Sequence, residues 1–182
     1  HNCLVGSEMC IRDRGKTCLL TRYMENEFPQ GRMPCLYEGS STRNLRIDNH
    51  SELQVFICDT TSKQDCIVPD GNYKGRVMRY IYTNVFMICM SVYDDGESDR
   101  GRNMDKSGMW TDSTIHTMAF CQEVQALCPS AVRILVGTRI DLRDDGKYKD
   151  TCYTKEEMEM FADIWDCHGY VECSSLTDNG VN

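Results

Sequence analysis

The sequence predicts an α/β fold, in which a doubly wound, mostly parallel sheet carries helices on both faces. Strand-like and helix-like segments alternate along most of the 182 residues, which is the pattern of parallel strands joined by crossover helices. Two short apolar runs, residues 85–90 and 132–136, have the composition of strands buried on both faces. The second run leads into a polar, Asp-rich loop, and open α/β sheets bind ligands at the carboxyl ends of such strands. We therefore expect one domain with a binding loop after residue 136.

Composition excludes several classes of function. The formal net charge of −8 argues against nucleic acid as the main partner, because binding a phosphate backbone needs a basic face. The 12 cysteines include no C-x-x-C pair, so metal-ligand spacing is absent and reduced thiols are expected. The longest apolar run, residues 85–90, is far shorter than the ~20 residues of a membrane span. We expect a soluble, cytoplasmic chain.

The first fourteen residues look foreign to the rest of the chain. Residues 4–14 have neither the pattern of a good strand nor that of a phosphate loop, and they resemble the translation of a transposase-based sequencing-library adapter. We expect residues 1–14 to be a non-native, adapter-derived leader, so that Val5-Gly6 does not end a true first strand. The alternative is a lineage-specific insertion. The functional domain is then expected over residues 15–182, truncated before a last helix.

Gly15-Lys16-Thr17-Cys18 matches the second half of the phosphate-loop pattern G-x-x-x-x-G-K-[ST], although Cys10 replaces the first glycine. In such a loop the backbone N–H groups at a helix N-terminus face the phosphates, the lysine reaches the β- and γ-phosphates, and the threonine ligates Mg²⁺. A bare G-K-T is also found in helices that bind nothing. We expect a helix to follow, with four apolar residues on one face: Leu19, Leu20, Tyr23 and Met24.

The middle of the chain predicts a hairpin followed by loops. Alternating apolar residues on either side of residues 48–51 predict a β-hairpin with one buried face; they are Leu45, Ile47, Leu53, Val55 and Ile57. Residues 66–75 contain Pro, Gly and Asn and are expected to form a loop, before a helix and turn over 76–84. The charged, Gly-rich residues 94–108 predict a long solvated loop.

Two further helices are predicted in the second half. One covers residues 113–128 and ends before Pro129; its buried stripe consists of Phe120, Cys121, Val124, Leu127 and Cys128. The other begins at the capping box Thr154-x-x-Glu157 and is expected to end at Gly169. Its buried stripe consists of Met158, Phe161, Ala162 and Trp165. A strand over 170–173 then leads to Ser174-Ser175.

The loop after the strand at 132–136 carries the clearest motif. Thr138-Arg139-Ile140-Asp141 resembles the guanine-specificity motif of small GTPases, Asn/Thr-Lys-x-Asp, and the following Leu-Arg-Asp-Asp resembles the Rho family in particular. A carboxylate at Asp141 accepts two hydrogen bonds from the N–H edge of guanine, and adenine has no matching donors. A site with buried polar groups rejects a base that cannot pair with them by roughly 10⁴-fold or more. The alternative interpretation is a solvated strand-end loop.

The same resemblance, over about residues 15–181, implies roles for other residues. Residues 172–176, Glu-Cys-Ser-Ser-Leu, are similar to the family's Glu-Cys-Ser-Ala-Leu, whose backbone N–H reads the guanine carbonyl oxygen. Phe28 stands where the family packs a Phe against the guanine, although a loop Phe tucked into the core is an equal alternative. Asp59 stands where a strand-end Asp holds Mg²⁺ through water, and Arg139 replaces the usual Lys. The implied nucleotide-binding residues are Gly15, Lys16, Thr17, Cys18, Phe28, Thr138, Arg139, Asp141, Ser174 and Ser175, and the implied metal-site residues are Thr17 and Asp59.

Both switch segments depart from the family pattern. Cys35 stands in place of the Thr that binds Mg²⁺ and the γ-phosphate, and a thiol is a poor ligand for this hard cation. Ser62 replaces the Gly whose N–H meets the γ-phosphate, and Lys63 replaces the Gln that orients the attacking water. Lysine has no acceptor, so we expect slow GTP hydrolysis and assign no catalytic residue with Lys63 at this position.

These observations lead to three hypotheses. The first is a divergent Rho-type small GTPase, a signalling switch that binds GTP or GDP with Mg²⁺ and has effector and regulator proteins as partners. The second is a pseudo-GTPase, a protein-interaction module without turnover. The third is a non-functional composite that lacks its central strand and aggregates through the exposed edge. No Cys-a-a-X box or basic tail is present, so membrane anchoring is not read from this sequence, and a full-length protein is expected in the cytoplasm or at the cytoplasmic face of membranes.

Overall fold

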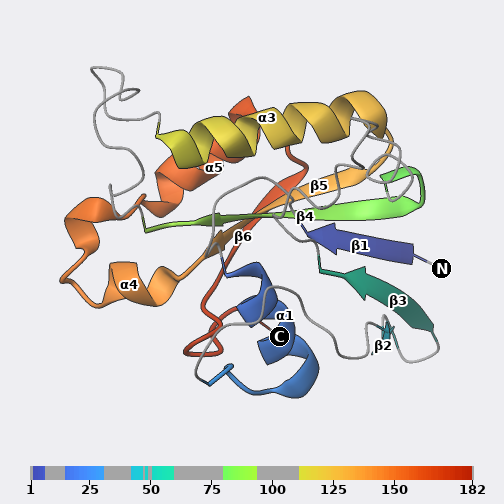
Figure 1. Ribbon diagram of the computed structural model, residues 1–182, viewed down its shortest axis with the longest axis horizontal. Coiled ribbons are helices and arrows are strands. Elements are labelled where there is room, and N and C mark those ends of the chain that lie inside the picture. Colours follow the sequence, from blue (N-terminus) through green and yellow to red (C-terminus); the bar gives the residue numbers. More distant parts are fainter. Residues whose placement is uncertain are drawn as a thin grey trace, which may run out of the picture.

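Six strands form one sheet in the order β2-β3-β1-β4-β5-β6 (Figure 1). The computed structural model describes residues 2–6, 15–30, 42–46, 48, 51–59, 80–93 and 111–181, and the structural statements below concern these residues. The strands are β1 (Asn2–Gly6), β2 (Thr42–Arg46), β3 (Glu52–Cys58), β4 (Thr83–Ser91), β5 (Val132–Thr138) and β6 (Gly169–Cys173). All neighbouring pairs are parallel except β2 with β3. The predicted α/β class with a mostly parallel sheet is confirmed.

Helices cover both faces of the sheet, as predicted (Figure 1). They are α1 (Lys16–Glu25), α3 (Asp112–Leu127), the short α4 (Ile140–Asp144), α5 (Lys155–Ile164) and the 3₁₀ helix η2 (Lys149–Thr151). The helices α3 and α5 lie on one face and α1 on the other (Figure 1). No helix of this described part is long and apolar enough to cross a membrane.

The first strand departs from the sequence-based expectation. We expected residues 4–14 to contain no true strand, but β1 pairs with β3 on one side, with Asn2 opposite Val55, and with β4 on the other, with Leu4 opposite Val85. Strand pairing is made by backbone groups, and an apolar Cys3-Leu4-Val5 run is compatible with it whatever its origin. The central strand that the composite hypothesis took to be missing is therefore present.

The position of β1 also determines where a ligand can bind. The chain passes from β1 through α1 to β2 and β3 on one side, and β4 then takes the place on the other side of β1. The carboxyl end of β1 is thus the point at which the strand order reverses, and open α/β sheets bind ligands in the crevice at such a point.

The larger core lies between the sheet and the helices α3 and α5. On β4, Phe86, Ile88 and Met90 are fully buried in this core, whereas Met87 and Cys89 belong to the cluster on the α1 face. This alternation confirms the prediction of a strand buried on both faces. The predicted stripe of α5 is also confirmed, since all four of its residues are buried: Met158, Phe161, Ala162 and Trp165.

Capping explains where the two long helices start. The side chain of Thr154 accepts a hydrogen bond from the Glu157 N–H, and the Glu157 carboxylate accepts one from the Thr154 N–H, so the predicted capping box is confirmed. In α3 a similar box joins Thr111 and Thr114. Each box satisfies N–H groups that have no partner within the helix.

Several local predictions were wrong. Leu127, the last residue of α3, is 43% exposed rather than buried. Gly169 does not end α5, because the helix stops at Ile164, Asp166 turns the chain with a φ of 54°, and Gly169 already belongs to β6. The Asp-rich segment after β5 is not all loop, because it contains the short helix α4, which begins directly after the left-handed residue Arg139.

The predicted hairpin forms, but its buried face is smaller than expected. Val55 of β3 is 2% exposed, whereas Leu45 of the edge strand β2 is 37% exposed. An edge strand has a neighbour on one side only, which leaves less of its surface covered. On α1, Leu20 is buried and the other three predicted apolar residues are half-buried. The loops predicted at 66–75 and 94–108 lie outside the described residues.

Candidate functional site

The N-terminus of α1 meets the end of β3 at one hydrogen bond. Gly15 precedes the helix in the left-handed region, with a φ of 80°, a conformation that glycine adopts readily. The hydroxyl of Thr17 donates to the carboxylate of Asp59 over 2.7 Å, although 42 residues separate the two in sequence. Both groups are oxygen donors of the kind that Mg²⁺ prefers, and this ion usually takes one or two protein ligands beside substrate phosphates. The two residues therefore fit a magnesium site.

The predicted guanine-reading residues come together at the ends of β5 and β6. The hydroxyl of Ser174, which is fully buried, donates to the carboxylate of Asp141. The Ser174 N–H donates to the Asn179 carbonyl over 2.8 Å, and the Thr177 N–H donates to the Ser174 hydroxyl over 3.2 Å. The loop after β6 thus holds the carboxylate of Asp141 from one side and leaves its second oxygen to other partners.

The phosphate-loop segment and the base-reading segment are in contact. Thr138 is buried, and its hydroxyl donates to the Met90 carbonyl over 3.4 Å. A Cβ atom on Gly15 would lie 3.6 Å from the Cβ of Thr138, so the two segments touch where a side chain on Gly15 would project. Arg139 takes a left-handed conformation, with a φ of 64°, before α4 begins. A nucleotide with its phosphates at the Gly15 segment and its base at the Thr138 segment would therefore have to lie over the contact between Gly15 and Thr138.

An ion pair that the sequence did not predict links the two segments that are predicted to bind the base. Arg143 of α4 donates two hydrogen bonds of 2.8 Å to the two carboxylate oxygens of Glu172 on β6. The hydroxyl of Tyr170 donates to the same carboxylate over 2.7 Å. The hydrogen bonds from Arg143 lower the pKa of Glu172 against the effect of burial, and burial raises the pKa of Tyr170. The pair stays ionised and Tyr170 stays protonated at neutral pH.

Gly137 makes room for this network. A Cβ atom at this position would lie 2.3 Å from the hydroxyl oxygen of Tyr170, which is shorter than any real contact. The strand therefore needs a residue without a side chain beside the Tyr170 ring. The signal was present in the sequence as a Gly within an apolar strand, which often marks the close approach of another group.

A second connection runs from α1 to the loop after β6. The guanidinium of Arg22 donates to the Ser175 carbonyl over 2.8 Å and to the Leu176 carbonyl over 3.2 Å, and it lies 3.9 Å from the carboxylate of Asp178. Arg22 thereby fixes the backbone of the loop to the helix that follows the phosphate loop. No sequence signal distinguished this arginine from an ordinary surface residue of a helix.

Other predicted site residues are less closely connected. Phe28 is half-buried after the end of α1 and belongs to neither buried cluster of the described residues. Cys18 is half-buried in the first turn of α1. Cys35, Ser62 and Lys63, which carry the predictions about hydrolysis, lie outside the described residues, as do residues 7–14 of the phosphate-loop region.

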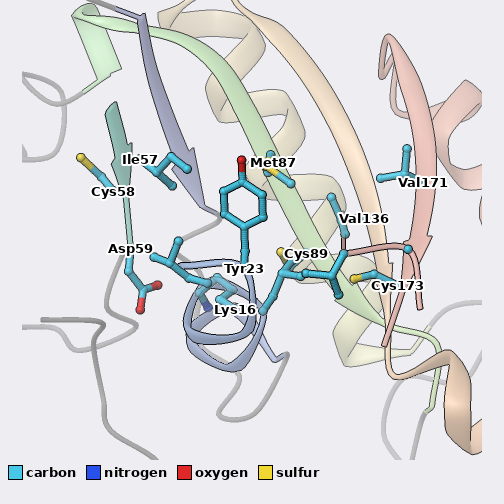
Figure 2. Close-up of a pocket in the computed structure, with 14 residues that line it drawn as sticks. Lys16, Tyr23, Ile57, Cys58, Asp59, Met87, Cys89, Val136, Val171 and Cys173 are labelled. Carbon is cyan, nitrogen blue, oxygen red and sulfur yellow. The ribbon is translucent and has the colours of Figure 1, made fainter. Parts of the chain in front are cut away.

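A cavity of about 270 Å³ lies between α1 and the sheet. Figure 2 shows Tyr23 of α1 pointing toward the sheet, with Asp59 and Lys16 near one end of the cavity and Val171 and Cys173 toward the other. Most of the lining is apolar and comes from the face of the sheet that carries α1, including Met87, Cys89 and Val136. The cavity therefore adjoins the Thr17–Asp59 pair but has no polar groups for a base or a phosphate along most of its length.

The strand order, the helix begun by Gly-Lys-Thr at the reversal point and the loops at the carboxyl ends of β3, β5 and β6 together define an α/β nucleotide-binding domain of the P-loop NTPase type. The Ras family model matches residues 3–104, which is more than half of the chain, so the chain belongs to the Ras family. It is a small GTP-binding protein, and members of this family bind guanine nucleotide, generally with Mg²⁺.

The matched region has informative limits. It begins at residue 3, within β1, and it ends before the segments at 138–145 and 172–176 that are predicted to bind the base. The family match and the guanine motif are therefore observations on different parts of the chain, and the fold connects them.

Proposed function

We propose that this protein is a Rho-type guanine-nucleotide switch with slow intrinsic GTP hydrolysis. The observation that carries the proposal is the hydrogen bond between Ser174 and Asp141. It fixes a carboxylate three residues after the buried Thr138, and Thr138 in turn lies against the Gly15 turn. This arrangement suits a purine with two adjacent N–H donors that is joined to phosphates. The Leu-Arg-Asp-Asp sequence after Asp141 supports the Rho type.

Each element of the site has a part in this proposal. The carboxylate of Asp141 accepts hydrogen bonds from the guanine N–H edge, and backbone N–H groups around Ser175 donate to its carbonyl oxygen. Lys16 and the first N–H groups of α1 bind the phosphates, since the positive end of the helix dipole favours anions. Thr17 and Asp59 would hold Mg²⁺, which neutralises charge on the β- and γ-phosphates when bound.

The first experiment measures binding of a fluorescent GDP analogue, with GDP and ADP as competitors. It uses the chain as given and a second chain with a complete G-x-x-x-x-G-K-T loop before residue 18. We expect tight, GDP-selective binding in the restored chain, lost at least about 100-fold in Asp141→Ala because a buried polar recognition pair is removed. Asp145→Ala is the matched control, since Asp145 directly follows α4 and is exposed. Equal competition by ADP and GDP would contradict the proposal.

Slow hydrolysis is tested separately by single-turnover measurements on the restored chain. Lys63→Gln restores a side chain that can both donate to and accept from water, so we expect it to raise the hydrolysis rate while leaving GDP affinity unchanged. A Lys63→Met variant serves as the control without either function. Rapid hydrolysis with Lys63 in place would contradict the proposed impairment.

A pseudo-GTPase is the second candidate function, and a specific observation favours it. The three replacements at Cys35, Ser62 and Lys63 fall on residues that in the family contact the γ-phosphate or orient the water that attacks it, and none of the three falls on a residue that binds the base. Switches of this kind depend on γ-phosphate and Mg²⁺ contacts that order two segments. If those contacts are lost, GDP and GTP forms differ little, and partners should bind both alike. A tenfold preference of a partner for the GTP form would exclude this candidate.

The adapter origin of residues 1–14 remains part of the proposal. Sequencing of the parent transcript and genomic locus tests it directly, and an intact genomic reading frame through these residues would refute it. The composite hypothesis assumed that the sheet lacks its central strand, whereas β1 occupies that position. Solubility of the isolated chain provides the experimental test, since a chain with an exposed sheet edge should aggregate.

A further inference from the structure

A pair of thiols lies on the opposite side of the sheet from α1. The sulfur of Cys121, in the middle of α3, is 3.9 Å from the sulfur of Cys167, in the turn between α5 and β6. A disulfide needs an S–S distance of about 2.05 Å, so the sulfurs must approach by roughly 2 Å. Cys167 follows Asp166, which has a φ of 54°, and lies outside both regular elements, so its turn can supply this movement.

The two thiols differ in their access to solvent. Cys121 is fully buried, whereas Cys167 is half-buried. A small oxidant therefore reaches Cys167 first, and Cys121 is placed directly behind it. This is the arrangement of a reactive cysteine beside a resolving cysteine.

A buried arginine accompanies Cys167. The guanidinium of Arg133 is 3% exposed and forms a 3.0 Å ion pair with Asp166, the residue before Cys167. Within the described residues its Nε and Nη1 atoms have no hydrogen-bond partner. The Arg133 N–H also donates to the His168 ring over 3.1 Å, so Arg133 contacts the residues on both sides of Cys167 and brings a positive charge close to its sulfur.

The electrostatic environment distinguishes Cys167 from other described cysteines. The hydrogen bond from Cys121 and the charge of Arg133 lower the pKa of the Cys167 thiol, although burial and the charge of Asp166 act in the opposite direction. Burial instead raises the pKa of Cys128, and that of Cys173 to about 12. A larger thiolate fraction makes Cys167 the better nucleophile at neutral pH.

We propose that Cys121 and Cys167 form an oxidation site, a dithiol that a peroxide converts to a disulfide between α3 and the α5–β6 turn. In the first step the Cys167 thiolate attacks one oxygen of hydrogen peroxide and the O–O bond breaks. Hydroxide is the leaving group, and Cys167 becomes a sulfenic acid. In the second step the Cys121 sulfur attacks the Cys167 sulfur and the S–O bond breaks. With the proton from Cys121, the net reaction turns two thiols and one hydrogen peroxide into a disulfide and two waters.

The test treats the full, reduced chain with hydrogen peroxide, alkylates the remaining thiols and digests it with trypsin without reduction. We expect a disulfide-linked pair of peptides, 107–133 and 156–182, with fragmentation locating the link at Cys121 and Cys167. Cys167→Ser should abolish the linked pair, and Cys173→Ser is the matched control because Cys173 lies in the same peptide and should leave the link intact. A linked pair that persists in Cys167→Ser would overturn the proposal, as would oxidation of Cys167 to sulfinic acid without any link.

Thermal unfolding supplies an independent readout. A link across 46 residues restricts the unfolded chain, so oxidation should raise the Tm by roughly 5–10 °C. Because Cys167 is half-buried, Cys167→Ser should fold with an unchanged Tm under reducing conditions and show no rise after peroxide. An equal rise in the wild type and in Cys167→Ser would overturn the proposal, since another group would then be responsible.

Discussion

The ion pair between Arg143 and Glu172 should contribute measurably to stability, and Arg143→Ala tests this. The side chains are only 19% and 15% exposed, and removal of Arg143 leaves the Glu172 carboxylate without its two 2.8 Å donors. Breaking a fully buried pair costs about 3–5 kcal/mol, whereas an exposed pair is worth about 0–1 kcal/mol. For this intermediate burial we expect the free energy of unfolding to fall by about 2–3 kcal/mol, or the Tm by roughly 5–10 °C.

The assay is urea unfolding followed by circular dichroism, with Lys155→Ala as the matched control. Lys155 forms a 3.7 Å pair with Glu159, but both side chains are more than half exposed, so its loss should change the free energy of unfolding by less than about 0.5 kcal/mol. A double-mutant cycle with Glu172→Gln separates the pair from other effects, because Gln still accepts from Tyr170 but carries no charge. A loss in Arg143→Ala no larger than in Lys155→Ala would refute the reasoning.

The same pair predicts a pH dependence with a definite sign. The folded-state pKa of Glu172 is lowered by Arg143, so its stabilisation is fully present above the unfolded pKa of roughly 4.3. It is lost as the pH falls through the lower folded pKa. The difference in stability between wild type and Arg143→Ala should therefore shrink below about pH 4.3. A difference that stayed constant to the acid limit of folding would show that the charge of Glu172 is not responsible.

Three further predictions follow from single contacts. Gly137→Ala would place a Cβ 2.3 Å from the Tyr170 hydroxyl and should lower the free energy of unfolding by about 2 kcal/mol. The loss should be smaller when Gly137→Ala is made in a Tyr170→Phe background, which lacks the hydroxyl. If urea unfolding shows that the effects of the two substitutions simply add, the clash with the hydroxyl is contradicted. Thr154→Ala removes the hydroxyl that caps α5 and should lower the free energy of unfolding by about 1 kcal/mol. Thr154→Ser keeps a capping hydroxyl and should leave the melting temperature unchanged. On the proposed function, removal of Mg²⁺ by EDTA should speed GDP release from the restored chain at least about tenfold. The effect should be smaller in Thr17→Ala made in that chain, because this variant lacks the partner of Asp59. An equal effect in both would argue against Thr17 as a ligand.

The Arg143–Glu172 pair also connects stability with the proposed function. Arg143 lies two residues after Asp141 and Glu172 two residues before Ser174, so the pair holds together the two segments that are proposed to bind the base. Its removal should speed GDP release in the restored chain, even though neither residue contacts the nucleotide in the proposal. Unchanged GDP release in a destabilised Arg143→Ala variant would limit the role of the pair to folding.

By itself, the sequence determined the features that depend on local pattern. Hydrophobic runs predicted β4 and β5, helical spacing predicted the buried stripe of α5, and the Thr154 capping box predicted its start. Such features follow from the period of side chains along one element and from bonds within a few residues. The guanine motif was visible for a similar reason, because its residues lie within one short segment.

Only the tertiary structure decided features that depend on residues far apart in the chain. The hydrogen bond from Thr17 to Asp59, the Arg143–Glu172 pair and the approach of Cys121 to Cys167 each join residues separated by 29 or more positions. The pattern of one segment does not say which distant segment it will contact. The resemblance implied a shared site for Thr17 and Asp59, but nothing in the sequence predicted the Arg143–Glu172 pair or the Cys121–Cys167 approach. Pairing by backbone groups likewise allowed β1 to form from a segment whose side-chain pattern suggested no strand.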